Sequence, residues 1–323
     1  MNPRLLALPL ALSLACTEGP AATETTAQTE TSGADTEDTS ETDTDTGETG
    51  SQPTCDGSGL EPGDHVVEMT HDGRLRVFTA HVPPGYDGTE LTPVVLDFHG
   101  LGSNSTQQQF FSYMDPLADA EGFIVVYPDG TQNADGDRAW DAGICCTDEP
   151  VDDVGFVRAM LDELDARLCV DPDRRFATGM SNGGLFSYRL GCEAADVIAA
   201  VAPVAGALGI DPFTNCQPVR PMPLWQIHGT VDGRVPFDGA RLSAEYWAEL
   251  NGCGGETSVT YQNGVVTCEA WDCPAGSEVE FCTAEGVDHC WPGQPFCIDP
   301  PSTEDIDSTA TIWEFFMAHP MPR

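Results

Sequence analysis

Short apolar runs alternate with longer amphipathic segments along most of the chain. Two β-rich runs, "RLRVFTAHVP" and "TPVVLDFHG", are closed by Pro or Gly and predict strands. The run "FIVVYPDG" is short and continuously apolar, which is typical of a buried parallel strand. We predict four further strands at "RRFATGM", "DVIAAVAPVAG", "PLWQIHG" and "EVEFCTAEG".

Amphipathic segments between these runs predict helices. One should span "NSTQQQFFSYMDPLADAEG" with Asn104 or Ser105 as its N-cap, and another should span "VDDVGFVRAMLDELDARL" from Asp152 or Asp153. The remaining helices are predicted at "NGGLFSYRLGC", "FDGARLSAEYWAEL" and "STATIWEFFMAH". Strands that alternate with helices predict an α/β fold, with a mostly parallel central sheet and helices on both of its faces. We expect no second domain after the last helix.

The first 16 residues have the composition of a secretory signal. Arg4 precedes the apolar run "LLALPLALSLA", which is too short to cross a bilayer as a mature helix. The segment resembles a bacterial lipoprotein signal, whose cysteine becomes the acylated first residue, although Ser13 stands where such signals usually carry Leu, Val or Ile. We therefore expect export and attachment to the outer cell surface or periplasmic membrane through a lipidated Cys16. The alternative is an ordinary export signal and a secreted protein.

Residues 17–54 differ sharply in composition from the rest of the chain. They are nearly all Thr, Glu, Asp, Ser, Gly and Ala, with no aromatic residue and no Arg. Such a segment cannot bury a core, so we predict a disordered acidic linker, with the folded domain at residues 55–323. Glycosylation of its threonines and calcium binding by its acids are the alternatives to a plain solvated spacer.

The formal net charge of −40 excludes one class of partner. All 13 basic residues are Arg, and the acidic residues are not confined to the linker. A surface of this charge repels nucleic acid, which we therefore do not expect as a partner.

The cysteine count favours an exported protein with disulfide bonds. Of 13 cysteines one belongs to the signal, which leaves an even set of twelve. Neither C-x-x-C nor H-E-x-x-H occurs, so we expect no metal site.

The segment "ATGMSNGGLFSYRLGC" places one serine between two glycines, where a strand should pass into a helix. Gly179 and Gly183 would let the two elements approach closely around a strained turn, which raises the hydroxyl of Ser181 above the sheet edge. The backbone N–H of Asn182 would then lie at a helix N-terminus, a position suited to an oxyanion. The alternative is a tight glycine-rich turn in which the serine has no role.

A nucleophilic serine needs a base and a carboxylate, which in this architecture follow it along the chain. Three histidines lie downstream of Ser181. His319 ends the last helix and His228 ends a buried strand, which leaves His289 in the loop "EGVDHCWPG" as the base. Asp232, in "HGTVDGRVPF", is the predicted carboxylate, whereas Asp288 is adjacent to the base and poorly placed to bond its ring.

The loop after the strand "VVLDFHG" should supply a second oxyanion donor. We prefer the N–H of Leu101, with that of Gly100 as the alternative. His99 is expected to be a structural hydrogen-bonding residue.

These segments together resemble the secreted esterases of the polyhydroxybutyrate depolymerase and feruloyl esterase type, within the α/β-hydrolase fold. The similarity runs in family order over roughly residues 63–318 and is carried by "DFHGLGSN", "VVYPDG", "AWDAGICC", "DDVGFVRAMLDEL", "CVDPDRRFATGMSNGGLFSYRLGC", "HGTVDGRVPF" and "DHCWPG". The resemblance implies that Ser181, Asp232 and His289 are nucleophile, orienting carboxylate and base. It also implies that Trp140 and Trp291 are rim aromatics near the acyl or alcohol group. Asp153 matches the family as well, and as a helix N-cap it needs no catalytic role.

Two departures from the family affect the expected substrate. Members that attack solid polymer often carry a separate binding module, for which the closing helix leaves no room, so we expect soluble oligomers or small esters. The dense cysteines of residues 253–297 suggest a stapled region beside the base, and Cys145 or Cys146 could pair with Cys169 or Cys192.

We therefore expect a monomeric serine ester hydrolase that acts through an acyl-enzyme on hydroxyalkanoate oligomers or on feruloyl or acyl-carbohydrate esters. No metal or organic cofactor is implied. A serine peptidase of the same fold and a non-catalytic surface binding protein are the alternatives.

Overall fold

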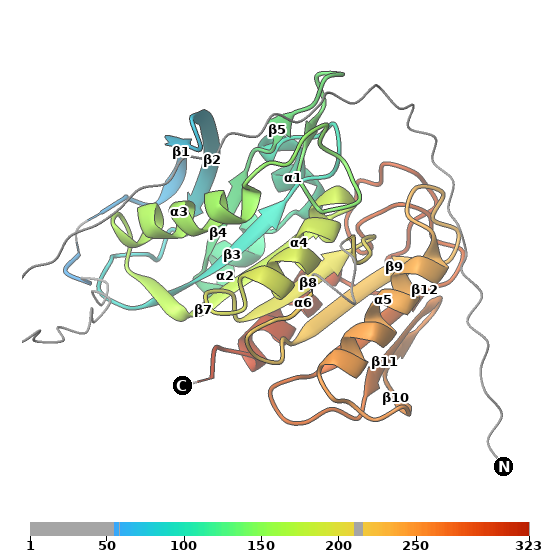
Figure 1. The fold of residues 1–323 in the computed structure, drawn as a ribbon. Coiled ribbons are helices and arrows are strands. Elements are labelled where there is room, and N and C mark those ends of the chain that lie inside the picture. Colours follow the sequence, from blue (N-terminus) through green and yellow to red (C-terminus); the bar gives the residue numbers. More distant parts are fainter. Residues whose placement is uncertain (1–54, 58, 210–215, 323) are drawn as a thin grey trace, which may run out of the picture. The chain divides into compact units, whose positions relative to one another are not determined.

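A computed structural model describes residues 55–57, 59–209 and 216–322, which all belong to one compact unit. The predicted signal peptide and linker lie outside the described residues. The described residues contribute ten strands to a single sheet and two short strands to another (Figure 1). The strands of the main sheet are β1 (Gly63–His71), β2 (Arg74–Val82), β3 (Thr92–Phe98), β4 (Ile124–Pro128), β7 (Val170–Met180), β8 (Ala200–Val204), β9 (Leu224–Gly229), β10 (Thr257–Asn263), β11 (Val266–Trp271) and β12 (Val279–Ala284). The short pair is β5 (Thr131–Gln132) and β6 (Arg138–Ala139).

The main sheet has a parallel centre and antiparallel edges. Its strand order is β1-β2-β4-β3-β7-β8-β9-β12-β11-β10. The six central strands, from β4 to β12, all pair in parallel. The outer pairings of β1, β2, β10 and β11 are antiparallel. This arrangement agrees with the mostly parallel sheet expected from the sequence.

Six helices cover the described sheet: α1 (Ser105–Ser112), α2 (Asp115–Glu121), α3 (Asp153–Asp165), α4 (Asn182–Glu193), α5 (Phe237–Leu250) and α6 (Ser308–Ala318). In β3, Val94 and Leu96 point into the core formed with α3, α4 and α5, whereas Val95 points into the core formed with α2 and α6. Successive side chains of a strand face opposite sides, so a continuously apolar strand must be covered on both. Figure 1 shows α3, α4 and α5 side by side on one face.

All seven strands expected from the sequence are present, and the unpredicted strands are the short pair β5 and β6 and three strands at the edges of the main sheet. The edge strands β1 and β10 and the neighbouring β11 were not predicted, and β10 is exposed along nearly its whole length. Edge strands bury too little surface for a strong apolar pattern. The expected helix after β3 divides into α1 and α2, because Tyr113 adopts a left-handed conformation with φ 51°. Its N-cap is Asn104, and that of α3 is Asp152.

The twelve cysteines after the signal form six disulfides. Their pairs are Cys55–Cys169, Cys145–Cys146, Cys192–Cys216, Cys253–Cys273, Cys268–Cys282 and Cys290–Cys297. The suggested pairing of Cys145 or Cys146 with Cys169 or Cys192 is wrong, because the first two bond to each other and the other two have different partners. Three bridges staple residues 253–297, as expected, and one of them begins directly after His289.

No helix among the described residues is long and apolar enough to cross a membrane.

Candidate active site

Ser181 occupies a strained turn between β7 and α4. Its backbone has φ 58° and ψ −122°, a conformation that costs a non-glycine residue energy and persists only where its surroundings impose it. The turn is held from both sides, since the N–H of Ser181 donates to the carbonyl of Val204 at 3.0 Å and its own carbonyl accepts from the N–H of Leu185 at 2.9 Å. The predicted strand-to-helix elbow is therefore present.

The two glycines that flank Ser181 are required by close packing. A Cβ atom on Gly183 would lie 2.0 Å from the carbonyl oxygen of Phe98, and one on Gly179 would lie 2.5 Å from the same oxygen. Real Cβ atoms do not approach a backbone oxygen so closely. Glycine at both positions thus lets the end of β3 pack directly against the elbow.

Asp232 and His289 come together because they follow neighbouring strands. β9 and β12 pair in parallel, so the loops after them emerge at the same sheet edge. The Nδ1 of His289 lies 2.8 Å from Oδ2 of Asp232, and both side chains are almost fully buried. When Nδ1–H donates to this carboxylate, the Nε2 of His289 is left free to accept a proton. Asp288, by contrast, accepts from the backbone N–H of His289 and not from its ring.

Four donors converge on the carboxylate of Asp232. Its Oδ1 accepts from the N–H groups of Arg234 and Val235, each at 2.8 Å, and its Oδ2 lies 3.2 Å from Nε2 of His228. Burial alone would raise the pKa of Asp232, but the bonds with His228, His289 and Val235 outweigh it and hold the pKa well below its usual range. Asp232 is therefore ionised at neutral pH. The sequence does not indicate a role for His228 at the site, whereas the structure places its ring against this carboxylate.

Ser181 and His289 line one small cavity of about 40 Å³. Its remaining walls come from the loop after β3, from α1, from the end of β7 and from the loops after β9 and β12; they are Gly100, Leu101, Ser103, Gln108, Phe111, Met180, Arg234 and Ile298. The structure thus brings the three predicted catalytic residues to one place, with Asp232 behind His289.

Of the predicted oxyanion donors, Leu101 lines the same cavity, and Asn182 directly follows Ser181 in the chain. Asn182 is the first residue of α4, so its N–H belongs to the positive end of the helix dipole. The carbonyl of Gly100 lies 2.7 Å from Nδ1 of His99, which accounts for one side of the Gly100–Leu101 peptide. Because C=O and N–H point in opposite directions in a trans peptide, the N–H of Leu101 is turned away from His99.

Trp140 and Trp291 do not occupy the rim positions expected of them. Their exposed fractions are 0% and 1%, and each indole N–H donates inside the protein, to the carbonyl of His99 and to Oγ1 of Thr309 respectively. Both indole N–H groups have acceptors inside the protein and both rings are buried, so neither side chain is presented to a ligand at the surface.

Several cavity residues carry no sequence signal that marks them. Gln108 is 1% exposed, and its amide donates to Oδ1 of Asp97 at 2.7 Å. Burial raises the pKa of Asp97 to about 7. Phe111, Arg234 and Ile298 lie in α1 and in loops, where neither periodicity nor a motif indicates a site.

Two groups of potential metal ligands occur among the described residues, and neither borders this cavity. In one, Cys268 and Cys282 are already bonded to each other beside Glu280. In the other, His81 forms ion pairs with Asp64 at 2.7 Å and with Asp115 at 3.8 Å. These contacts need no ion to explain them.

Comparison with known proteins places this geometry in context. The chain is 35% identical to "Feruloyl esterase B" of Piromyces equi over 225 residues, and this aligned region covers 64% of the chain and 41% of that protein. It is 34% identical over 225 residues to "Putative esterase NocK" of Nocardia uniformis subsp. tsuyamanensis, which covers 68% of the chain and 60% of that protein. The chain thus spans only part of the length of these relatives.

Solved structures support the fold. An acetyl xylan esterase from Aspergillus awamori superposes with a TM-score of 0.58 at 15% identity, over 79% of this chain and 99% of that one. A ferulic acid esterase from Anaeromyces mucronatus, in complex with ferulic acid, gives a TM-score of 0.53 at 16% identity, over 83% and 94% of the two chains. The architecture is that of the α/β-hydrolase fold, as expected. The sequence profile described as "Esterase PHB depolymerase" matches residues 77–252, more than half of the chain, and the chain therefore belongs to that family.

Proposed function

We propose that this protein is a serine ester hydrolase that works through an acyl-enzyme. The observation that carries the proposal is the contact of 2.8 Å between His289 and Asp232 at the cavity that Ser181 lines. Membership of the esterase family supports the same reaction class.

The reaction follows from these side chains. Ser181 Oγ attacks the ester carbonyl while His289 Nε2 takes its proton, and the resulting imidazolium is stabilised by the carboxylate of Asp232. The N–H groups of Leu101 and Asn182 stabilise the negative charge on the carbonyl oxygen. His289 then protonates the departing alcohol, and a water molecule repeats the sequence to release the acid.

The proposed substrates are soluble hydroxyalkanoate oligomers or feruloyl and acyl-carbohydrate esters. The names of the relatives, a feruloyl esterase and an acetyl xylan esterase among them, support ester substrates of the second kind. The family description supports the first kind. No metal or organic cofactor takes part, and we propose a monomer.

Initial rates on a panel of esters test this function. The panel comprises p-nitrophenyl acetate and butyrate, methyl ferulate and 3-hydroxybutyrate oligomers, with aminoacyl p-nitroanilides for a peptidase. We expect ester hydrolysis by the purified protein and its loss in Ser181→Ala. Faster cleavage of the anilides would establish a peptidase instead, and stoichiometric binding of a polyester without turnover would establish a binding protein.

We also propose that the protein is exported and anchored to a membrane through lipidated Cys16, with residues 17–54 as the spacer. The motif around Cys16 and the acidic composition of residues 17–54 support this arrangement. Mass spectrometry of the mature N-terminus should find an acyl group on residue 16, and Cys16→Ala should leave the membrane fraction. A Cys16→Ala protein that stays in that fraction, with no acyl mass on the wild type, would rule out the anchor.

A further inference from the structure

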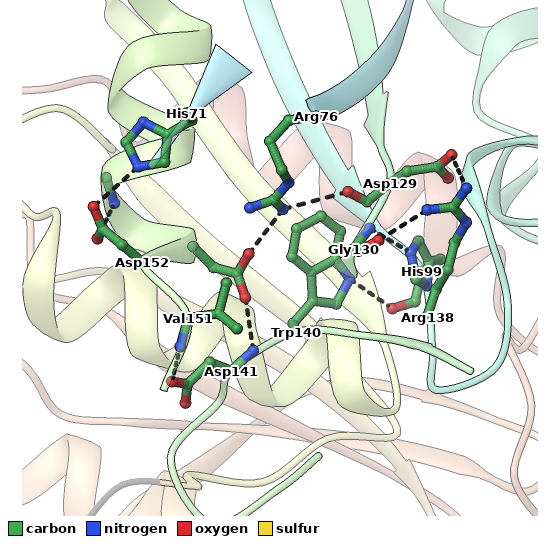
Figure 2. Close-up of polar contacts among 12 residues, drawn as sticks. His71, Arg76, His99, Asp129, Gly130, Arg138, Trp140, Asp141, Val151 and Asp152 are labelled. Atoms are coloured by element: carbon green, nitrogen blue, oxygen red, sulfur yellow. Dashed lines mark hydrogen bonds and ion pairs between the residues drawn. The ribbon is translucent and has the colours of Figure 1, made fainter. Parts of the chain in front are cut away.

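Trp140 makes hydrogen bonds to both segments that carry the proposed oxyanion donors. Its indole Nε1–H donates to the carbonyl of His99 at 3.0 Å, directly before the Gly100–Leu101 peptide (Figure 2). Its backbone N–H donates to Oδ1 of Asn182 at 2.7 Å, and its carbonyl accepts from Nδ2 of the same asparagine at 3.0 Å. One residue is thus bonded to the end of β3 and to the beginning of α4.

Packing fixes the orientation of the indole ring. Its centroid lies 5.1 Å from that of Phe98 in β3 at 84°, and 5.1 Å from that of Phe186 in α4 at 11°. Edge-to-face and stacked aromatic contacts of this kind are favourable. The ring is fully buried between the two elements whose ends it bonds, so it cannot change its rotamer without displacing one of them.

The backbone beside Trp140 is anchored to a buried ion pair. The N–H of Asp141 donates to Oδ2 of Asp153 at 2.8 Å, and Oδ1 of Asp153 lies 2.8 Å from Arg76. Arg76 is 2% exposed, and its guanidinium lies 3.8 Å from the ring centroid of Phe156. Removing one partner of such a pair would leave an uncompensated buried charge, so breaking this anchor is strongly unfavourable. Asp153 therefore does more than begin α3.

His99 connects Trp140 to the peptide that carries the N–H of Leu101. The N–H of Gly130 donates to Nε2 of His99 at 2.9 Å, so Nδ1 must carry the ring proton and donate to the carbonyl of Gly100. Burial lowers the pKa of His99 to about 4, which keeps this ring neutral at working pH. Trp140 bonds the carbonyl of His99, and the His99 ring bonds the next carbonyl, that of Gly100. Together these bonds fix the plane of the Gly100–Leu101 peptide, and with it the direction of the N–H of Leu101.

We infer that Trp140 is a positioning residue of the oxyanion hole, which sets the N–H groups of Leu101 and Asn182 relative to each other. This role rests on the proposed esterase function. Oxyanion donors act only if they already lie where charge develops in the transition state. Loosening them should therefore reduce the rate of chemistry and leave ground-state binding of the ester nearly unchanged.

Trp140→Phe tests the inference, with Trp247→Phe as its matched control. Trp247 in α5 is also fully buried, and its indole N–H donates to the carbonyl of Met222 at 2.8 Å, away from the cavity. Both variants lose one indole donor and some ring volume. We expect Trp140→Phe to lower kcat about 10- to 100-fold with little change in KM, because one donor of the pair is worth about 10²- to 10³-fold when removed completely. Affinity for an aryl boronic acid, which forms a tetrahedral adduct with serine, should fall by the same factor.

Amide hydrogen exchange supplies a readout that does not depend on turnover. Exchange in peptides that contain Leu101 and Asn182 should be faster in Trp140→Phe than in the wild type and unchanged in Trp247→Phe, at similar Tm for the two variants. Equal kcat and equal exchange in the two variants would overturn the inference. A wild type that cleaves no ester refutes the proposed function, whereas the exchange experiment still decides whether Trp140 positions these amides.

Discussion

Asp232→Asn is the substitution that tests the role of His289 as the base most directly. Oδ1 of Asp232 accepts from the backbone N–H groups of Arg234 and Val235, which cannot become acceptors. The amide oxygen of the asparagine must therefore take this side, and the amide NH2 must face His289. Two donors cannot face each other, so the imidazole will move its proton from Nδ1 to Nε2 and lose the ability to accept the proton of Ser181.

The expected loss is large because the wrong tautomer disables the base without removing it. The corresponding substitution in a serine protease triad lowers kcat by about 10⁴-fold, which equals about 5.5 kcal/mol of transition-state stabilisation. Steady-state rates on p-nitrophenyl butyrate measure it, and thermal unfolding checks that the variant is folded. The matched control is Asp288→Asn, since Oδ1 of Asp288 accepts from the backbone N–H groups of Gly233 and His289, which an amide oxygen can also satisfy.

We expect the Asp288→Asn variant to keep its activity within about threefold, because its two hydrogen bonds are retained. If Asp232→Asn is folded and retains more than a tenth of the wild-type kcat, the bond between Asp232 and His289 does not control the tautomer. If Asp288→Asn loses as much activity as Asp232→Asn, the carboxylate has been assigned to the wrong residue.

Two further substitutions address packing and buried charge. Gly183→Ala would place a Cβ 2.0 Å from the carbonyl oxygen of Phe98, so we expect at least about 3 kcal/mol of destabilisation in urea unfolding. Gly239→Ala in α5 meets no atom within 4 Å and should be neutral or stabilise by up to about 1 kcal/mol; equal effects of the two would refute the packing argument. Burial raises the pKa of Asp97 to about 7 in the folded state, so the folded protein keeps a proton that the unfolded chain releases above about pH 4. The contribution of Asp97 to stability therefore falls as pH rises from about 4 to about 7. We expect Asp97→Asn, which can still accept from Gln108, to lack this decrease of up to about 4 kcal/mol in the free energy of unfolding. The prediction is wrong if the free energy of unfolding varies with pH equally in the variant and in the wild type.

The central sheet could be predicted from the sequence because its strands are buried on both faces. β4 and β8 are apolar at every position, so composition alone distinguishes them from loops. The edge strands β1 and β10 are largely exposed and carry no such pattern. The bend at Tyr113 depends on one residue in a left-handed conformation, which local helix propensity does not indicate.

The catalytic residues were predictable for a different reason, which is chain order. A serine in a glycine-flanked elbow requires a carboxylate and a histidine from later strands, and few candidates follow Ser181. Elimination then led to Asp232 and His289, which the structure places 2.8 Å apart. The same reasoning did not identify His228, because this residue ends a buried strand. Its position there places Nε2 of His228 3.2 Å from Oδ2 of Asp232.

The two tryptophans show where such reasoning stops. An aromatic residue near a catalytic motif can contact substrate or support the residues that do, and the sequence around it is the same in both cases. For Trp140 the distinction depends on a carbonyl 3.0 Å from its indole nitrogen and on an asparagine that bonds both sides of its peptide. Those partners are 41 and 42 residues away along the chain. A residue that holds others in place is defined by contacts between segments that lie far apart in the sequence. The three-dimensional structure therefore shows what the sequence could not, that the Trp140 side chain is buried and bonds the carbonyl of His99, and does not face solvent.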